Sequence, residues 1–518
     1  MAWYNFRNRN DLQRVQVPVQ PRPNQVQKYR NAFMASAVNR LTQSWYTTLL
    51  GPNKTIQSDV KRLRGLSRHL VRNDVYASRY VNLVETRVVG PEGMHFQPRV
   101  VNEQGDLVPS VNNELLRGWN DWKTAASVDG QHFLDLEQLI IRGVARDGEV
   151  FVRLISDKRV NRYGLALQVI DADLLDNDYN NLTVGNGNTV VQGVEVDRLG
   201  VVVAYHFWTQ HPDDFKNGVV QTRQRVEADE VLHIYRPERI GQYRGLPWTA
   251  PAMYFLARLH EYMDAELVAA QAAASQVATI ETPLSDTSQY INSTDREVIE
   301  MEPGVAIRLA PGEKMNPWTV TRPTTAFEPF TKMILHGIAS ALSVSYSTLA
   351  SDMSEDNYSS ARMSGNYEQK HFDTIQAWFI RQFHMKVYRV WLQTSIQQKA
   401  LNVVGDPEDF HAVVFRGMKM QSPDLLKDLN AGSVGFKENV ISKTQWCAER
   451  GYDYREVLND RYEEMKLERE YEQFLKNEGL QPVEVQDELV LQEHEQTMVT
   501  EDTGSNEEAA ITNEGEQE

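Results

Sequence analysis

Residues 246–278 read LPWTAPAMYFLARLHEYMDAELVAAQAAASQVA and form the longest helical pattern in this chain. Pro247 suits the first turn of a helix, where the missing N–H has no intrahelical partner. One face then stays apolar until Pro283, through Leu256, Leu259, Met263, Leu267, Ala270, Ala274 and Val277. Thirty-odd helical residues would span roughly 45–50 Å. The small residues at 268–278 would let a second helix approach closely, so we expect a long, paired helix.

The segments after this helix predict the order insert, helix, loop, long helix. Residues 283–323 contain two Pro-Gly pairs, at 303–304 and 311–312, and predict a compact non-helical insert. A second helix follows and stops at Ser343, with one apolar stripe made of Phe327, Phe330, Ile334, Ile338 and Leu342. A third helix is predicted from about residue 358 to residue 398. Its apolar face consists of Phe372, Ile375, Phe379, Phe383, Val387 and Trp391.

The part of the chain before residue 246 predicts an extended arm, then helices, then strands. Residues 1–30 carry three prolines among polar residues and predict the arm. Helical spacing follows from Leu63 to Val84, and further helices are predicted around residues 111–123 and 134–146. Residues 148–236 are rich in β-forming residues and predict an antiparallel module. Within it, residues 193–208 predict a hairpin, and residues 225–235 predict one more strand.

Composition limits the class of protein. A chain of 518 residues is expected to form roughly two to four domains. The longest apolar run is six residues, 252–257, far short of a membrane span, so no membrane partner is predicted. Cys447 is the only cysteine, which excludes an intramolecular disulfide and favours a reducing, cytoplasmic setting for folding. These features predict a soluble intracellular chain.

Charge is concentrated at the two ends. Residues 1–99 hold 16 Lys and Arg against 5 Asp and Glu, whereas residues 477–518 hold 13 acids and no Lys or Arg. The basic end is either a set of solvated helix faces or a contact for nucleic acid or an acidic partner. The acidic end has too few apolar residues to fold, so we expect disorder from about residue 480.

Motifs for catalysis are missing from the sequence. There is no G-x-x-x-x-G-K-[ST], G-x-S-x-G or H-E-x-x-H pattern, so no nucleotide, cofactor or catalytic site is predicted. The best metal candidate is the carboxylate cluster Asp171, Asp173, Asp176 and Asp178, which fails the EF-hand spacing. Turn formation explains these aspartates better, so no metal site is predicted.

The segment 343–360 has an unusual composition. It contains seven serines, Thr348 and three acids without one Lys or Arg. One interpretation is a solvated connection in which Asp356 or Asn357 caps the next helix. The other is a surface that touches a polyanion briefly, because hydroxyls can contact phosphate while carboxylates prevent tight attachment. The candidate DNA-facing residues are Ser347, Thr348, Ser351, Asp352, Ser354, Glu355, Asp356 and Asn357.

Several segments, taken in their order along the chain, resemble segments of the lambda-like bacteriophage portal proteins. They are RGLSRHLVRNDVYA at 64–77, DGEVFV at 147–152, LQVIDAD at 167–173, VLHIYRPER at 231–239, GQYRG at 241–245 and NYSSAR at 357–362. The similarity extends over about residues 55–460. One departure is at residues 422–428, SPDLLKD, where the family usually has an Asp-Pro-x-Lys-Glu run.

The resemblance implies a mainly helical α+β portal fold and a division of the chain. Residues 31–246 would be the wing with its β-rich module, 247–282 and 324–343 the stem helices, and 283–323 the clip. Residues 344–358 would be the tunnel loop, 359–460 the crown helices, and 461–518 a charged helix with a disordered acidic tail. Residues 1–30 would remain an extended arm.

The resemblance also implies a structural, non-enzymatic role. The chain would form a ring, usually of twelve subunits, at one capsid vertex of the virion, assembled in the host cytoplasm. Double-stranded DNA would be packaged and ejected through the ring. Its other partners would be terminase, the major capsid and scaffold proteins, and the head–tail completion proteins. Two alternatives remain open: a minor capsid or head–tail adaptor protein, and a metal-dependent nuclease-like packaging subunit that uses the aspartate cluster.

Overall fold

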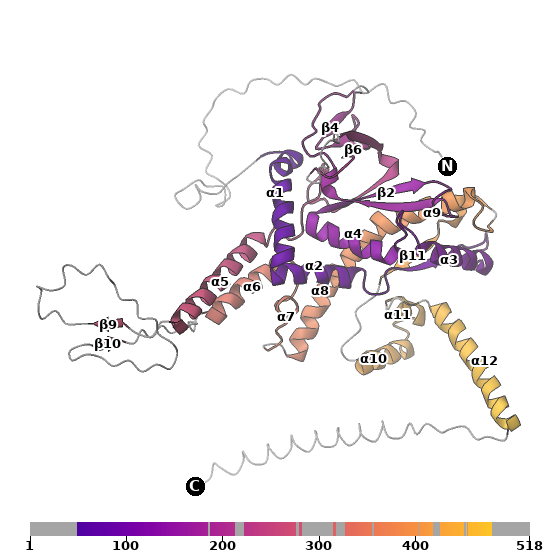
Figure 1. Ribbon diagram of the computed structural model, residues 1–518. Coiled ribbons are helices and arrows are strands. Elements are labelled where there is room, and N and C mark those ends of the chain that lie inside the picture. The colour runs from indigo at the N-terminus through magenta and orange to yellow at the C-terminus, as the bar shows by residue number, and fades with distance from the viewer. Residues whose placement is uncertain are drawn as a thin grey trace, which may run out of the picture. The chain divides into compact units, whose positions relative to one another are not determined.

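The computed structural model describes residues 49–184, 187–212, 222–275, 279–281, 314–316, 327–354, 357–403, 405–417, 425–449, 452 and 454–478. From Pro52 onward the described residues belong to one compact unit. Helices with small antiparallel sheets make up this unit, which confirms the mainly helical α+β class (Figure 1). The predicted arm at 1–30, nearly all of the insert at 283–323 and the acidic tail beyond Glu478 lie outside the described residues.

The first helices of the described chain are α1 (Pro52–Asn73), α2 (Val75–Val88), α3 (Pro109–Lys123) and α4 (Phe133–Asp147). Only Asp74 separates α1 from α2, and its carboxylate caps α2 by accepting the backbone N–H groups of Tyr76 and Ala77. α4 ends at Gly148, which adopts φ 91°, and a Cβ there would lie 2.4 Å from the backbone of Leu246. The helices predicted around 111–123 and 134–146 are confirmed.

The buried face of α1 differs from the predicted apolar face. Its buried residues are Ile56, Val60, Arg64, Ser67 and Leu70. Leu66, which lies at helical spacing between Leu63 and Leu70, is 42% exposed. The helix is therefore held partly by a buried arginine rather than by leucines alone.

Two antiparallel sheets form the predicted β-rich module. One has the order β3-β2-β8, from β2 (Glu149–Ser156), β3 (Leu165–Ile170) and β8 (Val231–Tyr235). The other has the order β4-β5-β6-β7, from β4 (Thr189–Val191), β5 (Val194–Val196), β6 (Val202–Trp208) and β7 (Arg223–Glu227). The predicted hairpin is β5–β6.

The prediction of a single strand over 225–235 is wrong. β7 ends at Glu227, a short 3-10 turn occupies Ala228–Glu230, and β8 begins at Val231 in the other sheet. The polar residues Asp229 and Glu230 form this turn, and it moves the chain from one sheet to the next. Phe151 of β2 packs between the sheets, edge-on to Tyr205 and Phe207 of β6.

The long helix predicted from Pro247 is shorter than expected. α5 covers Met253–Ser275, 23 residues or roughly 35 Å. Residues 247–252 form turns instead, with Ala250 N–H bonded to Pro247 and Ala252 N–H to Thr249. Pro251 explains the difference, because the residue before a proline disfavours the helical conformation. Strands β9 (Thr279–Glu281) and β10 (Lys314–Asn316) pair antiparallel beyond α5.

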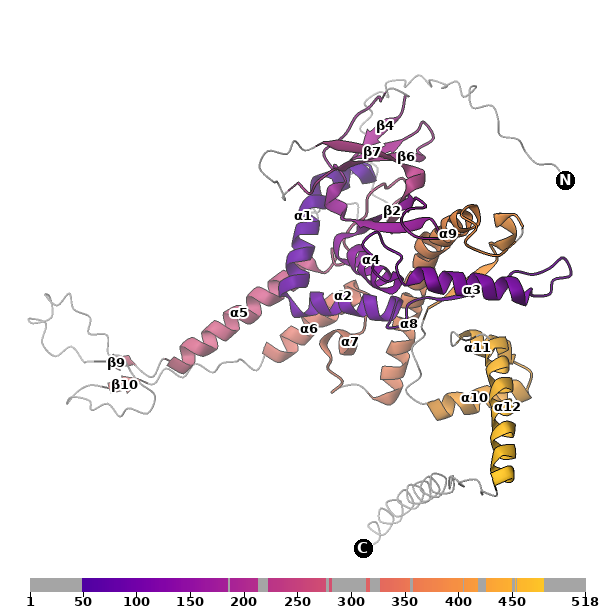
Figure 2. The same ribbon diagram turned by 45° about the vertical axis from the view of Figure 1, so that its right-hand side comes forward.

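α6 (Phe327–Ala341) runs beside α5, as both views show (Figures 1 and 2). Tyr262 of α5 stacks on Phe327 and meets Phe330 edge-on, with ring centroids 5.6 and 5.3 Å apart. The predicted pairing of two helices at this place is therefore confirmed for the described residues.

The third predicted helix is present over nearly its whole length. It consists of α8 (Tyr358–Phe379), a π-helical turn at Ile380–His384 and α9 (Met385–Gln397). Every residue of the predicted apolar face is at most 1% exposed: Phe372, Ile375, Phe379, Phe383, Val387 and Trp391. The π turn adds one residue to the helical repeat and keeps both halves of the face buried.

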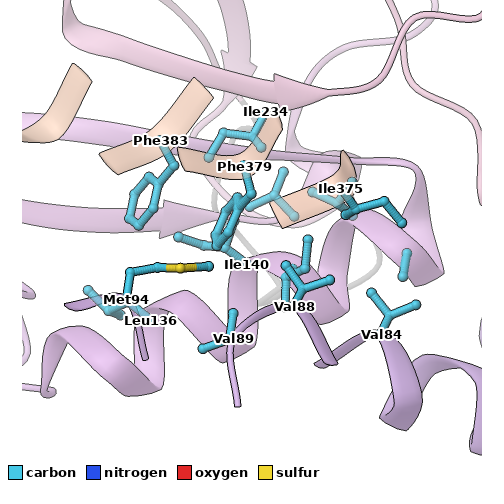
Figure 3. Close-up of a cluster of buried hydrophobic side chains, with 14 of the residues drawn as sticks. Val84, Val88, Val89, Met94, Leu136, Ile140, Ile234, Ile375, Phe379 and Phe383 are labelled. Atoms are coloured by element: carbon cyan, nitrogen blue, oxygen red, sulfur yellow. The ribbon is translucent and has the colours of Figure 1, made fainter. Parts of the chain in front are cut away.

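One hydrophobic core joins elements that are far apart in the sequence. Figure 3 shows Val84 and Val88 of α2, Leu136 and Ile140 of α4, Ile234 of β8, and Ile375, Phe379 and Phe383 pointing toward one another. β1 (His95–Pro98) pairs with β11 (Val413–Arg416) beside this core. The residues before 246 and those from 359 to 416 therefore share a core.

The last described helices are α10 (Leu425–Lys437), α11 (Lys443–Glu449) and α12 (Tyr454–Glu478). α12 covers the beginning of the segment predicted as a charged helix. In the part of the chain that the structure describes, none of the helices combines the length and apolar character that crossing a membrane requires.

Candidate functional site

The candidate site begins where α6 ends. Leu342 is buried, and Ser343 adopts a left-handed conformation with φ 58° that turns the chain out of the helix. The N–H of Val344 still reaches back to the carbonyl of Ala339 at 3.0 Å. This turn fixes the direction in which the predicted loop leaves α6.

The first half of the predicted loop is a short helix, α7 (Tyr346–Ala350). Ser345 caps it by accepting the N–H of Thr348, and both the N–H and the hydroxyl of Ser345 donate to Glu368 of α8, at 3.0 and 3.1 Å. Leu349 is 2% exposed and anchors α7 to the core. A helix of five residues is too short to show periodicity, which is why the sequence predicted only a loop.

α7 also contacts its other neighbours. Arg79 of α2 donates its Nε to the carbonyl of Thr348 at 3.4 Å, and His336 of α6 stacks on Tyr346 with 4.3 Å between ring centroids. The backbone of candidate residue Thr348 is thus tied to α2, while Tyr346 of the same short helix stacks on α6. Ser347 is half-buried on the same short helix.

The exposed part of the site follows α7. Ser351 adopts φ 55°, and Asp352 accepts hydrogen bonds from the hydroxyl of Tyr346 at 2.9 Å and from the hydroxyl and N–H of Ser354 at 2.6 and 3.0 Å. The hydrogen bonds from Ser354 and Tyr346 lower the pKa of Asp352 to about 2. Asp352 therefore carries its negative charge at any pH near neutrality.

Asn357 closes the site at the start of α8. Its side chain accepts the N–H of Ser360 at 2.8 Å, and the hydroxyl of Ser360 accepts the N–H of Asn357 at 3.1 Å. This capping box confirms the prediction that Asp356 or Asn357 caps the helix, with Asn357 as the cap. Glu355 and Asp356 lie outside the described residues.

The site brings together exposed hydroxyls and one fixed carboxylate. Ser351, Ser354 and Asn357 are exposed, and Asp352 is half-buried beside them. The nearest cation on α6, Lys332, is bonded to Glu328 at 3.1 Å. Ser351, Ser354 and Asn357 can exchange hydrogen bonds with a phosphate group, but none of these residues carries a positive charge that could hold one.

A second cluster, which sequence reasoning missed, is centred on Glu149 of β2. Glu149 is fully buried, and its carboxylate contacts Arg64 at 2.8 Å, Arg244 at 2.9 Å and His233 at 3.0 Å. Gly245 donates its backbone N–H to the same group at 2.8 Å. Burial alone would raise the pKa of Glu149, but Arg244, His233 and Arg64 hold it well below its ordinary value.

This cluster, which we call the Glu149 network, joins four segments that are separate in the sequence. Arg64 comes from 64–77, Glu149 from 147–152, His233 from 231–239 and Arg244 from 241–245. A fifth segment contributes Asp173, which contacts Arg64 at 2.6 Å. The available signal was a glutamate within the apolar run GEVFVRLI, where a buried charge requires a partner.

The four aspartates of the metal candidate each face a cation. Asp171 and Asp173 contact Arg68, Asp176 contacts Arg223 at 2.6 Å and Asp178 contacts Lys61 at 2.5 Å. Oxygen and nitrogen atoms of Asp171, Asp173 and His211 lie within 4.8 Å of one another. A divalent ion placed there would meet the guanidinium groups of Arg64 and Arg68, so the geometry favours ion pairing over metal binding.

Sequence comparisons with known proteins all point to one family. The sequence model of the family described as phage portal protein, lambda family, matches residues 38–376. A probable portal protein of Halomonas phage phiHAP-1 is 30% identical over 479 residues, which cover 88% of this chain and 91% of that protein. Portal protein B of Escherichia phage lambda is 21% identical over 441 residues, covering 75% and 80%.

A solved structure, the neck of an empty GTA particle, contains a chain with 14% sequence identity and a TM-score of 0.43. The match covers 76% of this chain and 94% of that chain.

Proposed function

Because this chain belongs to the lambda family of phage portal proteins, we propose that its copies form a closed ring at one capsid vertex. Phage DNA would be packaged and ejected through that ring. The role is structural: terminase would supply the motor chemistry, and head–tail connector proteins would dock later. The similarity to the probable portal protein of Halomonas phage phiHAP-1, over 88% of this chain and 91% of that protein, carries this proposal.

The surface of α5 and α6 supports ring formation. Large apolar side chains on both helices are exposed in the single chain: Tyr254 66%, Phe255 52%, Leu267 59%, Val268 62%, Phe330 43% and Met333 63%. Exposed apolar patches of this kind mark protein–protein interfaces. A closed ring would bury them against neighbouring copies on either side.

We assign the parts of the ring from the order of the elements. α5 and α6 would be the stem, residues 283–323 the clip that meets terminase and then the connector proteins, and residues 31–246 the wing. Residues 344–358 would face the channel, and residues 359–460 would form the crown. Capsid and scaffold proteins would contact the outer parts.

The proposed channel-facing surface is the exposed stretch around Asp352. Its hydroxyls can touch the phosphates of passing DNA, while its negative charge prevents lasting attachment. A ring would repeat this surface around the axis, so that no subunit holds the DNA in place.

Negative-stain electron microscopy of the purified protein tests the proposal. We expect closed rings, usually of twelve subunits, at micromolar concentration. Protein that stays monomeric under every assembly condition would contradict ring formation. Rings with residues 351–354 on the outer surface would favour a minor capsid or adaptor role.

The nuclease alternative has a separate test. DNA cleavage that requires a divalent metal and disappears in an Asp171→Ala, Asp173→Ala double variant would support it. We expect no cleavage with Mg²⁺ or Mn²⁺, because Arg64 and Arg68 occupy these carboxylates.

A further inference from the structure

Two arginine-lined hollows adjoin on the surface formed by α1, α2 and α4. The first, of about 370 Å³, is lined by Arg68, Arg72, Arg142 and Arg146 together with Asp171. The second, also of about 370 Å³, is lined by Arg72 and Arg79 together with Asp74. Arg72, in the last turn of α1, belongs to both hollows. Five guanidinium groups therefore face one stretch of surface beside two carboxylates.

The hydrogen bonds within these hollows do not use every guanidinium N–H group of the arginines. Arg68 donates its Nε to Asp147 at 2.7 Å, its Nη1 to Asp173 and its Nη2 to Asp171 at 2.9 Å, so three carboxylates neutralise it. Arg146 pairs with Asp147 through Nε and Nη2, at 3.1 and 2.7 Å. Arg142 uses its Nη1 for Glu85 and Asn82, at 2.8 and 2.7 Å. Among the described residues, the side chain of Arg72 makes no hydrogen bond or ion pair. The site thus offers one whole guanidinium group, with further N–H groups of its neighbours around it.

Guanidinium groups bind carboxylates and phosphates through paired N–H donors. A continuous phosphate backbone would have to pass Asp171, whose side chain is 40% exposed and shares the single charge of Arg68 with Asp147 and Asp173, and would be repelled there. An extended peptide can instead place separate carboxylates on Arg72 and Arg142 and avoid Asp171. The hollows therefore suit an acidic peptide better than duplex DNA.

The chain contains a matching peptide. Residues 479–518 carry twelve Asp and Glu and no Lys or Arg. Forty residues can extend as far as about 130 Å, enough to reach across a subunit or to its neighbour. We propose that this acidic segment docks in the two arginine-lined hollows, in its own copy or an adjacent one. Docking would cover the basic face of α1 and α2 and is independent of whether the copies form a ring.

Photo-cross-linking in the full-length protein tests the docking. In a Cys447→Ser background, Ser505→Cys provides a single thiol in the acidic segment for a benzophenone label. We expect illumination to give cross-links to peptides that contain residues 68–82 or 142–146, identified by mass spectrometry. Arg72→Glu should reduce their yield at least fivefold, and Arg72→Lys should retain most of it. Arg389→Glu, an exposed arginine on α9, is the matched control and should change nothing.

The side chain of Arg72 makes no hydrogen bond among the described residues, so Arg72→Glu should not unfold the protein. An unchanged melting temperature checks that a loss of cross-links does not reflect misfolding. Cross-links that fall elsewhere, or that survive Arg72→Glu, overturn the proposal. Binding of a short DNA duplex that Arg72→Glu abolishes while the cross-links persist would assign the hollows to DNA instead. Mixing isotope-labelled and unlabelled copies shows which copy supplies the segment; either result supports the docking.

Discussion

At the scale of single residues, the charge of Asp352 is central to the proposed channel surface. Asp352 stays ionised because Ser354 and Tyr346 donate hydrogen bonds to it. Asp352→Lys with Glu355→Lys should leave rings intact but slow or stall DNA packaging, because lysines hold phosphates. The effect should be strongest at low salt, where counterions compete least, and an in vitro packaging assay measures it.

The matched control makes the same charge change away from the site. Glu463→Lys with Glu470→Lys alters two exposed acids on α12 and should leave the packaging rate unchanged. If the Asp352 and Glu355 variant packages DNA at the normal rate at low salt, the charge of this surface does not matter.

Glu149 should be the most sensitive charged residue for stability. Glu149→Gln leaves Arg64 and Arg244 buried without their anion, a change that costs about 3–5 kcal/mol. Asp178→Asn removes the exposed pair with Lys61 and should cost about 0–1 kcal/mol. Thermal unfolding of the two variants compares them directly. Equal melting temperatures for both would show that the Glu149 network does not stabilise the fold.

The lowered pKa of Glu195 predicts how the stability of the fold changes with pH. Hydrogen bonds from Arg225, Asn188 and His206 lower its pKa to about 2. Because this pKa is depressed in the folded state, the stabilisation is complete above the unfolded pKa near 4.5 and is lost as the pH falls toward 2. The melting-temperature gap between the native protein and Glu195→Gln should be constant from pH 7 to about pH 5 and shrink below it. A gap that does not change with pH would refute this.

At the scale of elements, the start of α8 is a local structure that can be tested alone. Asn357→Ala removes the capping box and should destabilise the first turn of α8 by about 0.5–2 kcal/mol. Amide hydrogen exchange should become faster in residues 358–362, while α9 keeps its protection. Asn357→Gly should cost only a few tenths of a kcal/mol. Unchanged exchange in the alanine variant would mean that the cap does not hold the helix start.

Elements whose signals are local were predictable from the sequence. α3, α4 and the helix from Tyr358 to Gln397 follow from apolar spacing and caps within the elements themselves. α7 was missed because one short helix has no period, and the start of α5 was placed too early because Pro247 outweighed Pro251. The strand pair β1–β11 depends on contacts between residues more than 300 positions apart, which no local pattern records.

The candidate site was predictable only in part, for the same reason. Composition identified residues 343–360, and the cap at Asn357 was among the two predicted. Arg79 bonds to Thr348, and Ser345 bonds to Glu368. Both hydrogen bonds depend on how α2 and α8 pack, which only the fold reveals. The Glu149 network likewise depends on distant segments, although its arginines and aspartates lie in stretches that were already noted.

At the scale of the whole molecule, the single chain leaves large apolar side chains exposed on α5 and α6, which in the proposed ring would pack against neighbouring copies. The Glu149 network and the shared core tie α1, α2 and α4 to the sheet and to α8. These contacts would position residues 351–354 in each copy in the same way. A ring of such copies would present one continuous surface of hydroxyls and carboxylates.

A reconstruction of the assembled protein by cryo-electron microscopy would locate residues 351–354 in every copy. We predict a closed ring in which residues 351–354 of every copy face the central axis and α5 and α6 pack against the neighbouring copies. A ring in which these residues lie on the outer surface, or particles that contain no channel, would contradict the account.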